Sequence, residues 1–225
     1  MRPAAFLLFA VFLGAALPAA VPLAWPAGDV SHQAAAAAAS PAAAQRYVVV
    51  SNESEVLYRV NEVLFRDGNQ LSVAVGRTRA VRGEVVVDRA NPRQSRIGPI
   101  TVNISTFQSD SARRDQAIRG RWLESARFPM AEFRPTQVEG LPAAYTEGQQ
   151  LELKVTGDLK VRDVTRPVTF AMTVVLRGAT LTGAATATIK MSDFGFDPPS
   201  IFGILRTEDE ARLELQFVAR PQPQN

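Results

Sequence analysis

Side chains able to support acid–base or metal chemistry are few and scattered in this sequence. The single histidine, His32, precedes an alanine-rich stretch, and the chain has no cysteine. A Ser-His-Asp triad, a thiolate nucleophile or a His/Cys metal site therefore cannot be assembled. Asp193 and Asp197 flank Phe194-Gly195-Phe196 and could form a carboxylate pair, but such sequences more often cap turns. We expect no catalytic residue, no metal site and no cofactor.

A second candidate for chemistry is the adjacent pair Arg114-Asp115. Opposite charges at the start of a helix can fix the entry of the chain through charge-assisted hydrogen bonds to a neighbouring element. The same pair could instead hold the headgroup of a ligand. We favour the structural interpretation, because an ion pair at a rim needs no ligand to explain it.

The charge pattern argues against a nucleic-acid partner. The formal net charge is +3, and arginines cluster within residues 77–82 and 113–121. Acidic residues are interspersed with them, and no array of base-stacking aromatic residues accompanies the clusters. These arginines are typical of solvated rims of a folded domain.

The N-terminal 45 residues differ in composition from the rest. Residues 1–28 carry one positive charge at Arg2 and then a long apolar run, which predicts a signal peptide or a membrane anchor. Residues 29–45 are alanine-rich and read as a linker. The folded domain is predicted at 46–220, followed by a tail at 221–225. We expect an extracytoplasmic location: periplasmic, secreted, or tethered to the outer face of the cytoplasmic membrane.

The elements of this domain are predicted to be mostly strands. Apolar and polar residues alternate in runs such as 100–105, 151–156 and 168–176, with turn residues between them. The stretch 157–170, GDLKVRDVTRPVTF, reads as two strands joined by a tight polar turn. Such even spacing favours an all-β fold, a sandwich or an antiparallel barrel of about eight strands whose closure removes exposed edges.

One segment between residues 104 and 133 has helical character. Asp110 or Ser111 is a candidate N-cap, and Ile118 and Trp122 are four residues apart on one face. Phe128-Pro129 is expected to end the helix. A helix inserted there between barrel strands can cover one mouth of the barrel. The interior of such a barrel is wide enough either for its own side chains or for one small ligand, and the residues alone favour a filled core.

Five segments, in the same order along the chain, resemble segments of the YceI-like family of bacterial envelope proteins. They are residues 54–60, 83–88, 104–115, Phe128-Pro129 with Phe133, and 157–168. The chain departs from the family pattern at Val50 and Glu53, and it lacks a histidine near Val63. The resemblance implies a lipocalin-like barrel that holds a long isoprenoid or other lipid chain and has no catalytic centre.

The resemblance also implies an apolar lining for the ligand and a polar rim. The residues that match the lining are Phe107, Ile118, Trp122, Phe128, Phe133, Phe170 and Met172. The headgroup candidates are Arg114 and Asp115. Phe and Met side chains suit a flexible, methyl-bearing chain.

We therefore expect an exported lipid-binding protein, not an enzyme, that stores or transports a polyisoprenoid or quinone-like chain in a barrel tunnel. Its expected partners are that lipid and a membrane surface, with no nucleic acid; a homodimer is compatible with the sequence. The alternative is a structural or interaction module of the cell envelope whose barrel is fully packed. A continuous apolar cavity favours the carrier, and a solid core favours the module.

Overall fold

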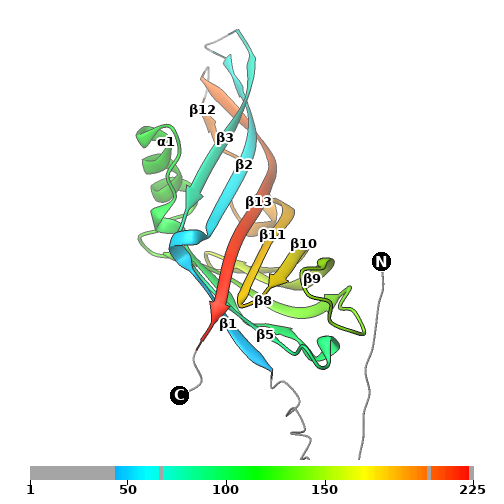
Figure 1. Ribbon diagram of the computed structural model, residues 1–225. Coiled ribbons are helices and arrows are strands. Elements are labelled where there is room, and N and C mark those ends of the chain that lie inside the picture. The colour runs from blue at the N-terminus through cyan, green and yellow to red at the C-terminus, as the bar shows by residue number, and fades with distance from the viewer. Residues whose placement is uncertain (1–43, 66–67, 202–203, 223–225) are drawn as a thin grey trace, which may run out of the picture. The chain divides into compact units, whose positions relative to one another are not determined.

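The computed structural model describes residues 44–65, 68–201 and 204–222 (Figure 1). The predicted export segment, residues 1–28, and residues 29–43 of the predicted linker lie outside this range. Within the described part, no helix combines the length and apolar character that a membrane span requires.

The described chain is dominated by one antiparallel sheet of thirteen strands. In chain order these strands are β1 (Gln45–Val49), β2 (Glu55–Leu64), β3 (Gln70–Thr78), β4 (Val81–Arg82), β5 (Glu84–Val87), β6 (Arg96–Ile97), β7 (Ile100–Asn103), β8 (Met130–Glu139), β9 (Gln150–Val161), β10 (Val164–Arg177), β11 (Thr180–Lys190), β12 (Ser200–Ile201) and β13 (Leu205–Pro221).

The pairing of these strands closes on itself. Strands β8, β9, β10, β11 and β13 pair in that order, and β13 then pairs with β2 and with β1. Strand β2 pairs with β3, which continues into β4, and β4 pairs with β7 beside β8. Because β1–β2, β3–β5 and β6–β7 are each one nearly continuous segment, eight segments form the circuit. The prediction of an antiparallel barrel of about eight strands is confirmed.

The predicted hairpin within residues 157–170 is present. Val161 pairs with Val164, so Arg162 and Asp163 alone form the turn between β9 and β10. Arg162 adopts a φ of 58°, the left-handed conformation that tight hairpins require. Side chains of β10 alternate between the two faces of the sheet, and Phe170, Met172 and Val174 point into the barrel together with its core.

The helical insertion lies between β7 and β8 and is shorter than predicted. Helix α1 (Ala112–Ala117) begins after Ser111, whose hydroxyl accepts a hydrogen bond from the Arg114 amide at 3.3 Å. One π-helical turn, η5 (Ile118–Trp122), continues it. The helix therefore ends at Trp122, and not at Phe128-Pro129. Glu124 adopts a φ of 45°, so the chain leaves the helical conformation before it reaches the proline.

Figure 1 shows how this insertion sits on the barrel. The green coils of α1 lie beside the upper part of the sheet, next to β3, while the red strand β13 runs past β2 and β11. Ala117, Ile118 and Trp122 face a cavity that is also lined by the strands. The insertion therefore forms one side of this cavity.

Candidate lipid-binding cavity

The barrel is not solid beneath the helical insertion. A cavity of about 380 Å³ lies between α1, η5 and the inner face of the sheet. Its wall is formed mainly by apolar side chains of β2, β7, β8, β10, β11 and β13. Alternation along these strands produces the wall, because every second residue of each strand points inward.

Six of the seven residues that match the family's apolar lining face this cavity. They are Phe107, Ile118, Trp122, Phe133, Phe170 and Met172. Phe133 of β8 and Phe170 of β10 pack edge to face with their ring centroids 4.8 Å apart, so these two side chains meet across the intervening strand β9. The structure therefore brings residues from β8, β10 and the helical insertion to one apolar surface.

Phe128 is the exception. It is not among the residues that line the cavity; it lies in the turn after η5, and the Arg127 guanidinium stacks 4.7 Å from its ring centroid. The structure places Phe128 outside the cavity wall, because the helix ends earlier than expected. The chain then turns at Glu124 and carries Phe128 away from the interior.

Small side chains make the space, and sequence reasoning missed them. Ala74, Ala131, Ala185 and Ala211 all line the cavity and are buried. Each occupies an inward position where a larger apolar residue would fill the barrel. Each of these alanines alternates with outward-facing residues along its strand, and that alternation is the signal that could have found them.

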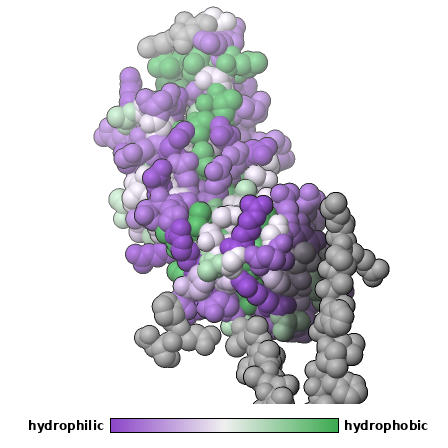
Figure 2. Space-filling view, in the orientation of Figure 1, coloured by the Kyte–Doolittle hydropathy of each residue, from purple (hydrophilic) through white to green (hydrophobic). Residues whose placement is uncertain are grey.

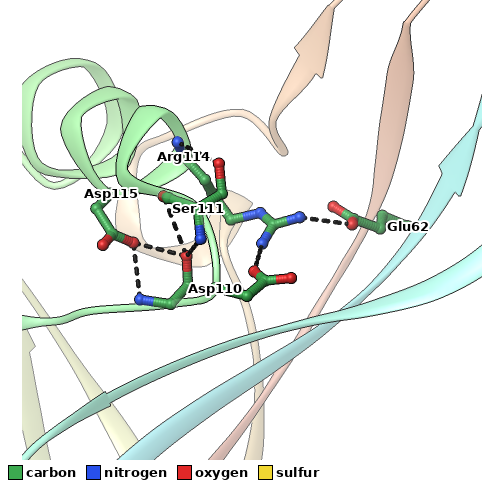
Figure 3. Close-up of polar contacts among 6 residues, drawn as sticks. Glu62, Asp110, Ser111, Arg114 and Asp115 are labelled. Atoms are coloured by element: carbon green, nitrogen blue, oxygen red, sulfur yellow. Dashed lines mark hydrogen bonds and ion pairs between the residues drawn. The ribbon is translucent and has the colours of Figure 1, made fainter.

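A buried ion pair lies at the polar side of the cavity (Figure 3). Arg114 donates to Glu62 of β2 at 3.0 Å and also pairs with Asp110. The Glu62 side chain is only 2% exposed, and both Glu62 and Arg114 line the cavity. Glu62 was not predicted as a site residue. It follows Val56, Tyr58 and Val60 at the next inward position of β2, which is the signal that could have found it.

Arg114 and Asp115 do not pair with each other. Asp115 instead accepts hydrogen bonds from the amide and the hydroxyl of Ser109, at 2.8 and 2.6 Å, and holds the loop that leads into α1. Asp115 is buried and does not line the cavity. Its position fits the structural interpretation, whereas Arg114 both joins the helix to the barrel and faces the cavity.

Tyr58 adds an uncharged polar group to the same wall. Its ring packs edge to face on Phe107, with centroids 5.2 Å apart. Burial, reinforced by the nearby carboxylate of Asp115, raises the pKa of Tyr58 to about 12. The hydroxyl therefore keeps its proton throughout the physiological pH range and can donate a hydrogen bond.

The carboxylates considered for acid–base chemistry lie elsewhere. Asp193 and Asp197 are exposed, and neither lines the cavity. Nearby Asp209 accepts a hydrogen bond from the Ser192 amide at 2.9 Å, and its bonds from Ser192 hold the pKa of Asp209 below the usual value. In the described ranges no three His, Cys, Asp or Glu side chains gather as metal ligands. His32 is outside those ranges.

A second, smaller cavity of about 90 Å³ lies farther along the barrel interior. Apolar residues of β9, β10, β11 and β13 line one side of it, among them Leu151, Val174 and Phe217, and residues of β1, β5, β6 and β7 contribute to the rest. Residues of the 140–149 loop, including Tyr145, border its outer side. The two cavities share three lining residues: Ile100, Met172 and Leu215.

A closed antiparallel barrel with an apolar cavity beneath one inserted helix defines a lipocalin-like barrel. A sequence model described as "YceI-like domain" matches residues 47–219. The chain therefore belongs to the YceI-like family, as its sequence pattern predicts.

Individual relatives agree with this assignment. "Protein YceI" of Escherichia coli O157:H7 is 29% identical over 119 residues, which is 50% of this chain. "Protein YceI" of Salmonella arizonae is 30% identical over the same length. The match spans 58% of the length of each of these curated relatives.

Two solved structures share the fold. Burkholderia cenocepacia BcnA superposes with a TM-score of 0.57 at 22% identity, covering 76% of this chain and 98% of that one. A polyisoprenoid binding domain from Saccharophagus degradans also gives a TM-score of 0.57, at 10% identity, covering 80% of this chain and 99% of that one.

Proposed function

We propose that this protein binds a polyisoprenoid or quinone-like lipid chain in the 380 Å³ cavity and serves as a carrier or store for it. The observation that carries the proposal is the cavity itself. A packed structural barrel would fill this space, whereas here inward alanines keep it open between aromatic and aliphatic walls. The description of the Saccharophagus degradans domain as polyisoprenoid binding supports the same ligand class.

The polar groups of the site support a bound chain with a small headgroup, and not a reaction. Glu62, Arg114 and Tyr58 lie on one side of an otherwise apolar wall, so a headgroup can lie there while its tail extends along the barrel. Neither a nucleophile with an adjacent base nor a metal-ligand cluster accompanies them in the described chain. The proposed activity is binding, without a cofactor.

The energetics favour a membrane as the donor of the lipid. Burying a methylene group from water contributes about 0.8 kcal/mol, so a long isoprenoid would exceed the ceiling of roughly 20 kcal/mol for noncovalent affinity. Exchange from a bilayer is closer to balance, because both environments are apolar. We therefore also propose that the domain works outside the cytoplasm beside a membrane, with the apolar run of residues 1–28 directing it there.

The test is recovery of lipid from the purified protein. We expect organic extraction, followed by mass spectrometry, to release an isoprenoid or quinone-like lipid from protein produced with its native membrane. Met172→Arg places a charge at a buried position of the wall, which is 6% exposed, and the desolvation cost of several kcal/mol should abolish binding.

Met130→Arg is the matched control, because Met130 is 43% exposed on the surface. This variant should keep its lipid. Circular dichroism melting separates loss of lipid from loss of fold. Wild-type protein that never carries lipid, or folded Met172→Arg protein with its full lipid content, would contradict the proposal.

A further inference from the structure

We infer that Met172, Ile100 and Leu215 form a partition across the barrel that sets the length of the lipid chain the protein holds. This inference rests on the proposed function, since it concerns how the same cavity selects its ligand. Its basis is the division of the barrel interior into two apolar spaces that meet at these three side chains.

The three residues come from separate strands and lie at one level. Met172 of β10 pairs with Ala185 of β11, and Ala185 pairs with Leu215 of β13. The row therefore runs across three adjacent strands with a small residue in its middle. Ile100 of β7 contributes to the same two spaces from another part of the wall.

Met172 is the residue of this partition whose side chain can most easily rotate out of the way. Its unbranched side chain has three rotatable bonds, whereas Ile100 and Leu215 are branched. Ala185 beside it offers no bulk to hold it in place. A rotamer change at Met172 is thus the smallest movement that would connect the two spaces.

The second cavity is shaped for the tail of a chain. Its inner wall contains Leu151, Val174, Leu176 and Phe217. An empty apolar space forfeits the contacts that a filled one would make, and water gains few hydrogen bonds there. A chain that passes Met172 would fill it, and a chain that stops at Met172 fits the first cavity alone.

The experiment uses isoprenoid alcohols that share one headgroup and differ in length. Geraniol, farnesol, geranylgeraniol and geranylfarnesol would displace a fluorescent apolar probe from delipidated full-length protein. Affinity should rise by about fourfold for each additional buried carbon until the accessible space is full, and then stop rising. The length at which it stops is the measured break point.

Met172→Ala should move the break point to a longer alcohol by at least one isoprene unit, because it removes the partition and adds the second cavity. Met191→Ala is the matched comparison. Met191 is buried and lines the first cavity only, so this variant removes the same side chain without joining the two spaces. Its shift should be clearly smaller. Circular dichroism melting would verify that both variants fold.

The break points of the two variants and of the wild type test the partition and the proposed function separately. A larger shift in Met172→Ala than in Met191→Ala supports the partition. Equal shifts, an unmoved break point in Met172→Ala, or a wild type without a break point overturns it while leaving lipid binding intact. Failure of every alcohol to bind wild-type protein would instead overturn the proposed function, and the partition with it.

Discussion

Arg114 of α1 and Glu62 of β2 form an ion pair at 3.0 Å that joins the helix over the cavity to the wall of the barrel. The Glu62 side chain is 2% exposed and that of Arg114 is 23% exposed. Arg114 also pairs with exposed Asp110, as Figure 3 shows. Loss of Arg114 would therefore leave Glu62 without this cation, whereas loss of Glu62 would leave Arg114 still paired with Asp110.

This asymmetry predicts unequal losses of stability. Arg114→Met keeps a long side chain but leaves a buried carboxylate without its cation, and should lower the free energy of unfolding by roughly 3 kcal/mol. Glu62→Gln leaves Arg114 partly exposed and still beside Asp110, and should cost about 1 kcal/mol. Urea denaturation at neutral pH measures both values. Arg220→Met, which breaks an exposed pair with Glu53, should have no measurable effect, and equal losses at positions 62 and 114 would contradict the prediction.

The charges of the cavity wall predict a preference for an uncharged headgroup. Five charged residues line the cavity, and they sum to −1: Glu62, Arg113, Arg114, Glu132 and Glu214. Because the Arg114 cation already has two carboxylate partners, a diphosphate gains little there.

Geranylgeraniol should therefore bind wild-type protein more tightly than geranylgeranyl diphosphate in the same displacement assay. Glu62→Gln should shift the ratio of the two affinities toward the diphosphate by about tenfold, since it removes one negative charge beside the ligand. Glu53→Gln removes a carboxylate outside the cavity wall and should leave the ratio as it is. Wild-type protein that binds the diphosphate more tightly than the alcohol would contradict the predicted preference for an uncharged headgroup.

Much of the fold follows from the alternation of residue types. The inward series at Val168, Phe170, Met172 and Val174 is readable because a strand has a period of two, and the structure confirms it. The closure through β3, β4 and β7 is not readable in this way. Strand β4 spans only Val81–Arg82, too short to leave a pattern, and its partner is set by tertiary packing.

The candidate site was predictable where family resemblance and alternation agreed, as at Phe133 and Phe170. The position of Phe128 outside the cavity wall was not predictable. The helix ends where Glu124 adopts a positive φ, and the residue types there do not indicate this conformation. Glu62 was missed for another reason. A glutamate in an amphipathic strand is read as solvent-facing, although its place in the inward series of β2 contradicts that reading.

The surroundings of Tyr58 predict an alkaline loss of stability. Its pKa is raised from 10.0 to about 12, chiefly by burial, so the folded state holds the phenolic proton more tightly than the unfolded state. This contribution is complete below pH 10 and is lost as the pH rises toward 12, with a total of roughly 3 kcal/mol.

Urea denaturation between pH 9 and 12 would therefore show a steeper decline for the wild type than for Tyr58→Phe. Tyr145→Phe is the comparison, because Tyr145 lies at the edge of the second cavity, away from the Tyr58 site, and is only partly buried. That variant should retain most of the decline. Identical profiles for wild type and Tyr58→Phe would show that the phenol is not buried as described.

Gly76 of β3 is predicted to hold the cavity open by leaving room for the Tyr58 ring. A Cβ at Gly76 would lie 2.1 Å from Cε1 of Tyr58 and 2.3 Å from its Cζ, far inside contact distance. Gly76 and Tyr58 are cross-strand partners, so the backbone cannot move one away from the other without breaking the β2–β3 register. The ring itself must shift, and the space beside it is the cavity.

Gly76→Ala should therefore lower both lipid affinity and stability, the latter by about 2 kcal/mol, as overpacking of a core does. Gly120→Ala is the matched control, because a Cβ there meets no atom within 4 Å and the residue lies in a helical turn. Its stability should be unchanged or slightly higher. Adding Tyr58→Leu to Gly76→Ala should recover part of the lost stability, since the smaller side chain removes the clash. A Gly76→Ala protein with wild-type melting temperature and lipid affinity would show that the Tyr58 ring can move aside without occupying the cavity.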